Sequence, residues 1–227
     1  MINNMENQFE KIVEMANINN KWDDSNRTQR YFLEPIFCGN QNIRMVSFMV
    51  NVAWGNQYLL ELLEIMQRYN CNVTFFLEGT WAHMYPHLAK AIRDAGHEIG
   101  NHAYSHADMR GLTEEYIIWE LRNTNAVIFK ELGIKPSLFT PPYATYNERI
   151  VKIVAQEGMK TVLSSIDTQD WNTNNPDEII NKVNSDLKNG SIILMHPTEV
   201  IINTLPTIIK NIEKHGVRIG KISDIIS

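Results

Sequence analysis

Short apolar runs alternate with amphipathic segments from residue 45 onward, and this alternation constrains the fold more than any other feature of the sequence. Each run is short enough for one β-strand, and each intervening segment has the apolar spacing of an α-helix. The apolar runs cover residues 45–52, 72–77, 97–100, 138–140, 160–165, 191–195 and 217–222. The expected helices cover residues 58–69, 86–95, 114–132, 147–157, 177–187 and 205–215.

Glycines mark where four of these helices should end. Gly96, Gly133, Gly158 and Gly216 each follow an expected helix, at the position where a left-handed conformation commonly stops one. Strand, helix and strand therefore repeat with short connections, which implies parallel strands and an α/β architecture. Seven strands suit a distorted (β/α)7-type barrel, and a doubly wound sheet is the alternative.

The sequence divides at about residue 40. Residues 1–40 form a polar, Asn-rich N-terminal extension with one amphipathic helix expected around Phe9, Ile12, Val13 and Met15, and residues 41–227 form the α/β domain. The first residues lack the basic and apolar stretches of a signal peptide, and no run approaches the ~20 apolar residues of a membrane span. The sequence as written therefore predicts a cytoplasmic protein without a membrane span.

The net charge argues against two classes of partner, and the cysteine count argues against a disulfide-stabilised fold. The formal net charge is -5 and the basic residues do not cluster, so neither nucleic acid nor an anionic membrane is expected. Two cysteines, Cys38 and Cys71, do not make a disulfide framework. We expect two free thiols, although the sequence does not show whether they meet.

Polar residues fall where five expected strands end. Asn51 ends the first run, and His102 and His106 follow the third. Thr140-Pro-Pro-Tyr143, Asp167-Thr-Gln-Asp-Trp171 and Met195-His-Pro-Thr198 follow the next three. Because chemistry in α/β folds is built at the carboxyl ends of the strands, these residues should face one site.

His102 and His106 give the strongest local signal. A spacing of four residues on a helical turn would bring both imidazoles to one side, where they could share a cation. The alternative is a pair of surface histidines at a helix start, or one buried ring bonded to the backbone. Asp108 could add an oxygen ligand, but a surface aspartate at a helix start is the more ordinary interpretation. Similarly, Glu78 could act on substrate, but a glutamate at a strand end is usually solvated.

The ordered series Gly100-Asn-His-Ala-Tyr-Ser-His106, Phe139-Thr-Pro-Pro-Tyr143, Asp167-Thr-Gln-Asp-Trp171 and Ile192-Ile-Leu-Met-His196 resembles the motifs of polysaccharide deacetylases. This is the NodB-homology type, carbohydrate esterase family 4, and the similarity runs from about Met45 to the C-terminus. Val52-Ala-Trp-Gly-Asn and His196-Pro-Thr-Glu resemble the sporulation-associated branch. The family fold is a distorted (β/α) barrel with about seven strands.

The resemblance implies metal-assisted removal of acetyl groups from N-acetylated sugars in peptidoglycan or chitin-like polymers. A divalent cation, zinc by preference, polarises the amide carbonyl and lowers the pKa of a bound water. A carboxylate takes the water proton and an imidazolium protonates the leaving amine. The family's first motif supplies the base and the third metal ligand from two adjacent aspartates. An arginine in the third motif orients the base.

The site residues of the family match this sequence only in part. His102 and His106 occupy the metal-ligand positions, His196 the position of the acid, and Asp170 that of the acid's tuning partner. Tyr143 matches the residue whose backbone N–H serves the oxyanion, while Leu194 and Trp171 match residues that line the sugar groove.

Three positions depart from the family pattern. Asn51 stands at the base position, Val52 at the third-ligand position and Thr140 where arginine is expected. An amide has no useful pKa, so Asn51 cannot act as the base, and loss of a base lowers the rate by ~10²–10⁴. Two histidines also leave a zinc site one protein ligand short.

Three functions are consistent with this pattern. The first is a weak or altered metal-dependent carbohydrate N-deacetylase. The second is a catalytically silent member that binds a glycan or a protein in the inherited groove. The third is a hydrolase of a small N-acyl substrate in which the substrate replaces the lost base. Ser105 and Ser165 lack a His/Asp arrangement, which argues against serine-hydrolase chemistry. For Trp54 and Trp81, packing is the more ordinary role, and stacking against a sugar is the alternative.

Overall fold

A computed structural model describes residues 34–226, in which strands and helices alternate along the chain. The helix expected near Phe9 and most of the expected N-terminal extension lie outside the described residues. The strands are β1 (Met45–Val52), β2 (Thr74–Leu77), β3 (Glu98–Asn101), β4 (Leu138–Phe139), β5 (Lys160–Thr161), β6 (Ile166–Asp167), β7 (Ile192–Met195) and β8 (Arg218–Gly220). The helices are α2 (Asn56–Arg68), α3 (Gly79–Met84), α4 (Pro86–Asp94), α5 (Glu114–Leu132), α6 (Glu148–Gln156), α7 (Pro176–Asp186), α8 (Glu199–Lys214) and α9 (Ile222–Ile225).

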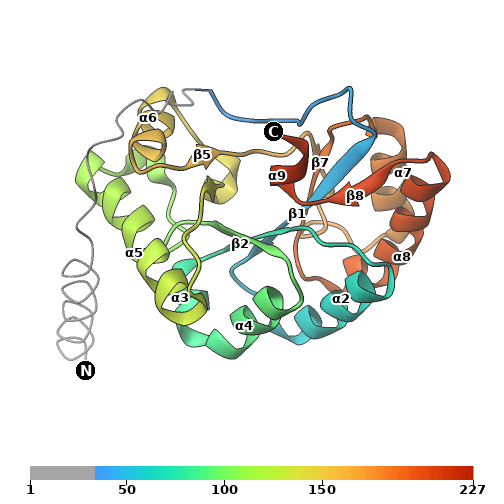
Figure 1. The fold of residues 1–227 in the computed structure, drawn as a ribbon, viewed down its shortest axis with the longest axis horizontal. Helices are drawn as coiled ribbons and strands as arrows, with labels where there is room; N and C mark the ends of the chain where they lie inside the picture. Colours follow the sequence, from blue (N-terminus) through green and yellow to red (C-terminus); the bar gives the residue numbers. More distant parts are fainter. Residues whose placement is uncertain (1–33, 227) are drawn as a thin grey trace.

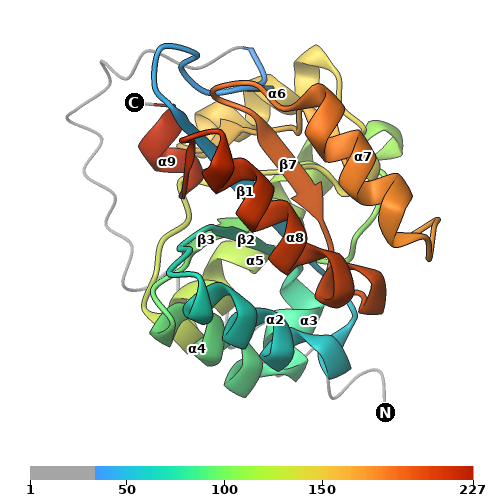
Figure 2. The same cartoon turned by 90° about the vertical axis from the view of Figure 1, so that its right-hand side faces the viewer.

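The strands form one curled parallel sheet. Its order is β5-β4-β3-β2-β1-β7-β6, and β8 adds to β1. Helices α2 to α8 lie around the outside of the sheet, as Figure 1 shows. The view turned by 90° shows α8 in front of β1, with α2 next to the lower part of α8 (Figure 2). The expected distorted (β/α) barrel is confirmed in the form of a half-barrel, and the doubly wound alternative is wrong.

Three apolar clusters hold this arrangement together, and in one of them α5 and α6 pack against Phe139 of β4. Of the other two, the larger lies between the sheet and the helices and includes Val50, Val52 and Leu77 from the strands. The smaller fills the inner face, where Met49, Phe76 and other strand residues meet α9. Successive residues of β1 thus belong to opposite layers, as the alternation of side chains along a strand requires.

The expected strand at residues 160–165 is in fact two short strands. β5 pairs with β4 and β6 pairs with β7, so the two lie at opposite ends of the sheet order. An extended segment bridges the opening between these ends, where Ile36 pairs with Val162 and Cys38 pairs with Ser191. A continuous apolar run could not reveal that its two halves pair with different neighbours.

Three helices also differ from expectation, and one of them is α9, which begins at Ile222, where the last apolar run was expected to be a strand. α3 was not expected, because it is a short helix that directly follows β2 without a separate apolar stripe. α8 begins at Glu199, not near residue 205, and carries Pro206 inside it. Proline commonly stands in the first turn of a helix, which explains why the sequence pattern placed the start too late.

Candidate functional site

The polar residues that follow the strands gather at the carboxyl ends of the sheet. Asn51 lies level with Phe76 of β2, which lies level with Gly100 of β3, and His102 comes two residues later. Thr140 lies beside this loop because its N–H donates to the carbonyl of Asn101. The expectation that these strand ends face one site therefore agrees with the register of the sheet.

Asn51 and Val52 have different surroundings. Asn51 is 7% exposed, and its Oδ1 atom is buried without a hydrogen-bond partner among the described residues. Val52 is 0% exposed and belongs to the large apolar layer under the outer helices. One position thus holds an unpaired polar atom, and the next holds a methyl-bearing side chain that cannot ligate a metal.

His102 is buried and has a defined tautomer. Its Nδ1 lies 2.9 Å from the backbone oxygen of Thr140, and because a carbonyl only accepts, Nδ1 carries the proton. Nε2 is then the nitrogen with a free lone pair. Burial lowers the pKa of His102 to about 3, and the nearby His106 and His196 imidazoles add to this effect.

His106 lies beside His102 on a loop that Asn101 and α5 hold in place. The two imidazole centroids are 5.0 Å apart, with the rings tilted by 79°. Burial also lowers the pKa of His106. The pair therefore lies close enough to act on one ligand, although the residues sit in a loop and not on the helical turn that the spacing suggested.

Glu120 of α5 fixes the backbone between the two histidines. Its carboxylate, in a residue 4% exposed, accepts hydrogen bonds from the N–H groups of Tyr104 and Ser105 at 2.6 and 2.8 Å. It also accepts from the Ser105 hydroxyl at 2.5 Å. Glu120 belongs to none of the motifs recognised in the sequence, although a glutamate on the buried stripe of an amphipathic helix is a recognisable signal of a polar role in the interior.

Several residues at the site have left-handed backbone conformations. Ala103, His106, Tyr143, Ala144 and Gln169 all have φ between 54° and 60°. Such conformations cost free energy for residues with a side chain, and they persist only where the surroundings enforce them. The loops of this site are therefore built to a specific shape.

Asp170 and His196 form a second cluster across the site. The buried Asp170 carboxylate accepts from the backbone N–H of His196 at 3.0 Å and lies 3.0 Å from His196 Nδ1. It also accepts from the hydroxyls of Thr168 and Thr198, each at 2.9 Å. Four groups therefore converge on one carboxylate, and the His196 imidazole is held with its Nε2 edge away from Asp170.

Exposed aromatic side chains surround these histidines. The Trp54 ring stacks on the His196 ring with centroids 5.5 Å apart and a tilt of 12°. Tyr143 meets His106 edge-on at 4.7 Å. Trp54, Tyr143 and Trp171 are 44%, 65% and 59% exposed. By contrast, Leu194 is buried in the inner apolar layer, and Trp81 is buried and donates to Asn56.

Two acidic residues from the sequence analysis are engaged elsewhere. Asp108 accepts from the Arg110 guanidinium at 2.6 Å and from the Thr145 hydroxyl at 3.0 Å, and these donors lower its pKa. A glutamate at a strand end was expected to be solvated, but Glu78 is buried, with an exposed fraction of 4%. Its carboxylate caps α3 by accepting from the Trp81 N–H and the Thr80 hydroxyl, and burial raises its pKa.

The donors present fit a divalent metal only in part. Within residues 34–226, no three His, Cys, Asp or Glu side chains lie where they could hold one ion together. His102 and His106 supply imidazole nitrogens of the kind that zinc prefers, but Val52 supplies no third ligand. The centre is therefore one protein ligand short.

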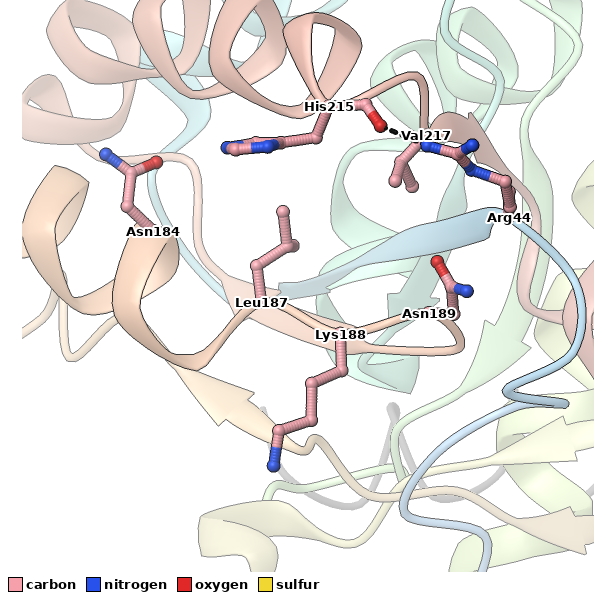
Figure 3. Close-up of a pocket in the computed structure, with 7 residues that line it drawn as sticks. All are labelled: Arg44, Asn184, Leu187, Lys188, Asn189, His215 and Val217. Carbon is pink, nitrogen blue, oxygen red and sulfur yellow. Dashed lines mark hydrogen bonds between the residues drawn. The ribbon is translucent and has the colours of Figure 1, made fainter.

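A cavity of about 500 Å³ opens at the opposite end of the sheet (Figure 3). It lies beside residues that precede β1, β7 and β8, and its lining comprises Arg44, Asn184, Leu187, Lys188, Asn189, His215 and Val217. The Arg44 guanidinium donates to the backbone oxygen of His215, and Lys188 points away from the cavity. This cavity shares no residue with the strand-end site.

Comparison with known proteins agrees with the geometry. The sequence profile of the polysaccharide deacetylase family matches residues 39–162. The chain belongs to this family. It is 29% identical over 187 residues to a peptidoglycan-N-acetylglucosamine deacetylase of Bacillus cereus, covering 80% of this chain and 68% of that protein.

Two further family members are more similar in sequence. YlxY of Bacillus subtilis is 41% identical over 193 residues, which cover 85% of this chain and 60% of YlxY. The crystal structure of BA3943 from Bacillus anthracis, described as a CE4 family pseudoenzyme, has a TM-score of 0.84 and 36% identity. That match covers 86% of this chain and 69% of BA3943. A mutant of BA3943 is described as having restored enzymatic activity, with the same TM-score.

Several relatives are named as peptidoglycan deacetylases. One is the peptidoglycan-N-acetylmuramic acid deacetylase PdaA of Bacillus subtilis, which is 26% identical over 202 residues that cover 85% of this chain and 75% of PdaA. Among the described residues, no helix is both long enough and apolar enough to cross a membrane.

Proposed function

We propose that this deacetylase-family domain binds N-acetylated amino-sugar polymers of the peptidoglycan or chitin type at the carboxyl ends of its strands, and that its centre lacks efficient hydrolysis. The observation that carries the proposal is the pair Asn51 and Val52. An amide whose Oδ1 is buried and unpaired stands where the family base would be, and a buried valine follows it.

The groove around this centre retains the parts that would hold a sugar. Trp171 is exposed at a position expected to line the groove, and Tyr143 is exposed at the position expected to serve the oxyanion. The loops that carry His106 and Tyr143 have left-handed backbone conformations. Strain of this kind is maintained by surrounding contacts and is common at binding sites. Binding without rapid turnover is the function that these observations support best.

Weak metal-dependent deacetylation is the second candidate. The Asp170–His196 pair supports it, because this carboxylate can hold an imidazolium ready to protonate a leaving amine. The tautomer of His102 supports it too, since its free Nε2 is suited to ligate a divalent metal, zinc by preference. Thr140 offers no cation to orient a base.

Acetate release from N,N′,N″,N‴,N⁗-pentaacetylchitopentaose, measured with added zinc, separates the two candidates. The proposal expects the natural sequence to bind this oligosaccharide but to release no more acetate than the His196→Ala variant, which serves as the background. Acetate release that His196→Ala abolishes would favour the weak enzyme. Absence of binding to both chitopentaose and peptidoglycan fragments would refute the proposal.

The double substitution Asn51→Asp with Val52→Asp tests the assignment of the missing groups. If the rest of the centre is in place, the double variant should release acetate at least tenfold faster than the natural sequence, within the range of a single general base. The restored activity described for a BA3943 mutant encourages this test. Adding Thr140→Arg shows whether the missing guanidinium limits the rate further.

A further inference from the structure

The loop after β1 carries an aromatic side chain close to the positions where the family pattern has two carboxylates. Trp54 follows Asn51 and Val52 by a few residues, and its indole lies over His196 with nearly parallel rings. His196 covers one face of the indole, yet the residue remains 44% exposed. A stacked ring with one open face beside the centre is a platform that a ligand can cover.

The position of this ring is fixed by the backbone. Gly55 has φ of 83°, and a Cβ atom there would lie 2.2 Å from the backbone oxygen of Pro197. The loop after β1 therefore packs directly against the loop after β7, and a residue with a side chain cannot replace Gly55 without moving one of them. This close contact holds Trp54 against His196, so the indole is placed before any ligand arrives.

The ligand that fits an open indole face is a pyranose ring. The C–H groups on one face of a sugar are apolar and pack against the negative face of an aromatic system, while the hydroxyl and acetamido groups remain free for hydrogen bonds. We infer that Trp54 is a binding residue that stacks on one sugar of an N-acetylated oligosaccharide, beside the unit that occupies the centre. This inference rests on the proposed glycan binding.

Tyr143 contacts a different histidine, since its ring meets that of His106 edge-on. An oligosaccharide that crosses the site would thus meet aromatic rings from the loops after β1 and β4. We therefore expect an extended chain of sugars, which can contact both rings, to bind more tightly than a single small N-acyl molecule. Affinity should accordingly increase from N,N′-diacetylchitobiose to pentaacetylchitopentaose.

Substitution of Trp54 tests the inference with the full chain. We expect Trp54→Ala to weaken chitopentaose binding about tenfold in calorimetry, and Trp54→Phe to retain most of the affinity because a ring remains. Phe129→Ala is the matched control, since Phe129 is 62% exposed on α5 outside the site. It should bind as the natural sequence does. Thermal unfolding of each variant shows that it is folded.

Fluorescence supplies an independent readout. Ligand that covers the Trp54 indole should change its emission, and Trp54→Phe should lose this change while still binding. Equal affinity of Trp54→Ala and the natural sequence would overturn the inference but leave glycan binding intact. Tighter binding by Trp54→Ala would overturn it as well, because the indole would then obstruct the groove. A natural sequence that does not bind chitopentaose at any accessible concentration would overturn both proposals.

Discussion

Val52 stabilises the fold at the position where the family pattern led us to expect a third metal ligand. It is fully buried in the apolar layer between the sheet and the helices. A carboxylate at this position would lose hydration, which costs several kcal/mol unless a partner compensates. The residue that replaces a metal ligand in the family pattern is thus one that suits the core.

A substitution at this position should make stability depend on zinc. We expect Val52→Asp to lower the free energy of unfolding by about 3 kcal/mol in the absence of metal. If Val52 stands at the third-ligand position, zinc should restore part of this loss, because the new carboxylate would join His102 and His106 as a ligand. Urea unfolding with zinc and with a chelator measures the effect.

Val50→Asp provides the control for this experiment. Val50 is equally buried in the same layer but lies two residues earlier in β1, away from the strand end. Its variant should be destabilised to a similar degree and should not respond to zinc. If zinc stabilised neither variant, Val52 would not stand at the third-ligand position.

His97 makes stability sensitive to acid. Its Nδ1 accepts the N–H of Val73, and burial, with a contribution from Lys221, lowers its pKa to about 4. The unfolded chain takes up this proton near pH 6.5, so the folded state loses stability as the pH falls from about 6.5 to 4. The loss should reach about 3 kcal/mol.

Urea unfolding between pH 4 and 7 measures this prediction. His97→Asn keeps an acceptor near Val73 but cannot be protonated in this range. The variant should therefore show a smaller fall in stability over the same interval. Equal pH dependence in the variant and the natural sequence would assign the acid sensitivity to other groups.

At the scale of elements, α5 determines the shape of the histidine loop. Besides Glu120, the backbone oxygen of Leu121 accepts a hydrogen bond from Asn101, whose Oδ1 accepts from the Ala103 N–H. One helix thus holds both ends of a loop with left-handed residues. The histidine pair depends on this helix even though α5 contributes no side chain of the family motifs.

Removal of the Glu120 carboxylate should loosen this loop. Glu120→Ala removes the buried carboxylate that accepts from the Tyr104 and Ser105 N–H groups, and we expect a loss of about 2 kcal/mol in the free energy of unfolding. Hydrogen exchange at Tyr104 and Ser105 should become faster. Glu120→Gln should retain most of the protection because its amide oxygen can accept both bonds. Glu131→Ala, on the same helix but paired with Lys90, should leave exchange at this loop unchanged.

The sequence predicted helices better than it predicted short strands. α5 begins and ends where the pattern places it, because Thr113 caps its start and Gly133 follows its end in a left-handed conformation. β5 and β6 could not be separated, because pairing with different neighbours is a property of the sheet and leaves no mark on the apolar run. At the site, the spacing of His102 and His106 predicted a helical turn where a strained loop exists.

The whole molecule depends on how the half-barrel is closed. The segment from Ile36 to Gly39 lies across the opening, and the N–H of Gly39 donates to the carbonyl of Gly190 just before β7. Edge strands with free backbone groups invite unwanted pairing, and this segment covers them on one side. Closure therefore comes from backbone outside the repeating strand–helix units, which is why the repeat alone did not predict it.

Gly190 is the point at which this closure can be tested. It has φ of 78°, and a Cβ atom there would lie 2.5 Å from the Gly39 backbone oxygen. Gly190→Ala should lower the free energy of unfolding by about 3 kcal/mol, from backbone strain and displacement of the segment. Gly133→Ala has a similar φ but open space, so it should cost only about 1 kcal/mol. Equal losses in urea unfolding would show that the segment adjusts freely.

The four hydrogen bonds that meet at Asp170 have a consequence for engineering. They are made by residues that follow β6 and β7, and none of the four is made by a side chain of the loop after β1. A designer can therefore vary residues 51–53 in a library while keeping Trp54 and Gly55, which contact His196 and Pro197 of the opposite wall. The domain offers a pre-assembled histidine–carboxylate pair beside which new nucleophile-activating groups could be selected one position at a time.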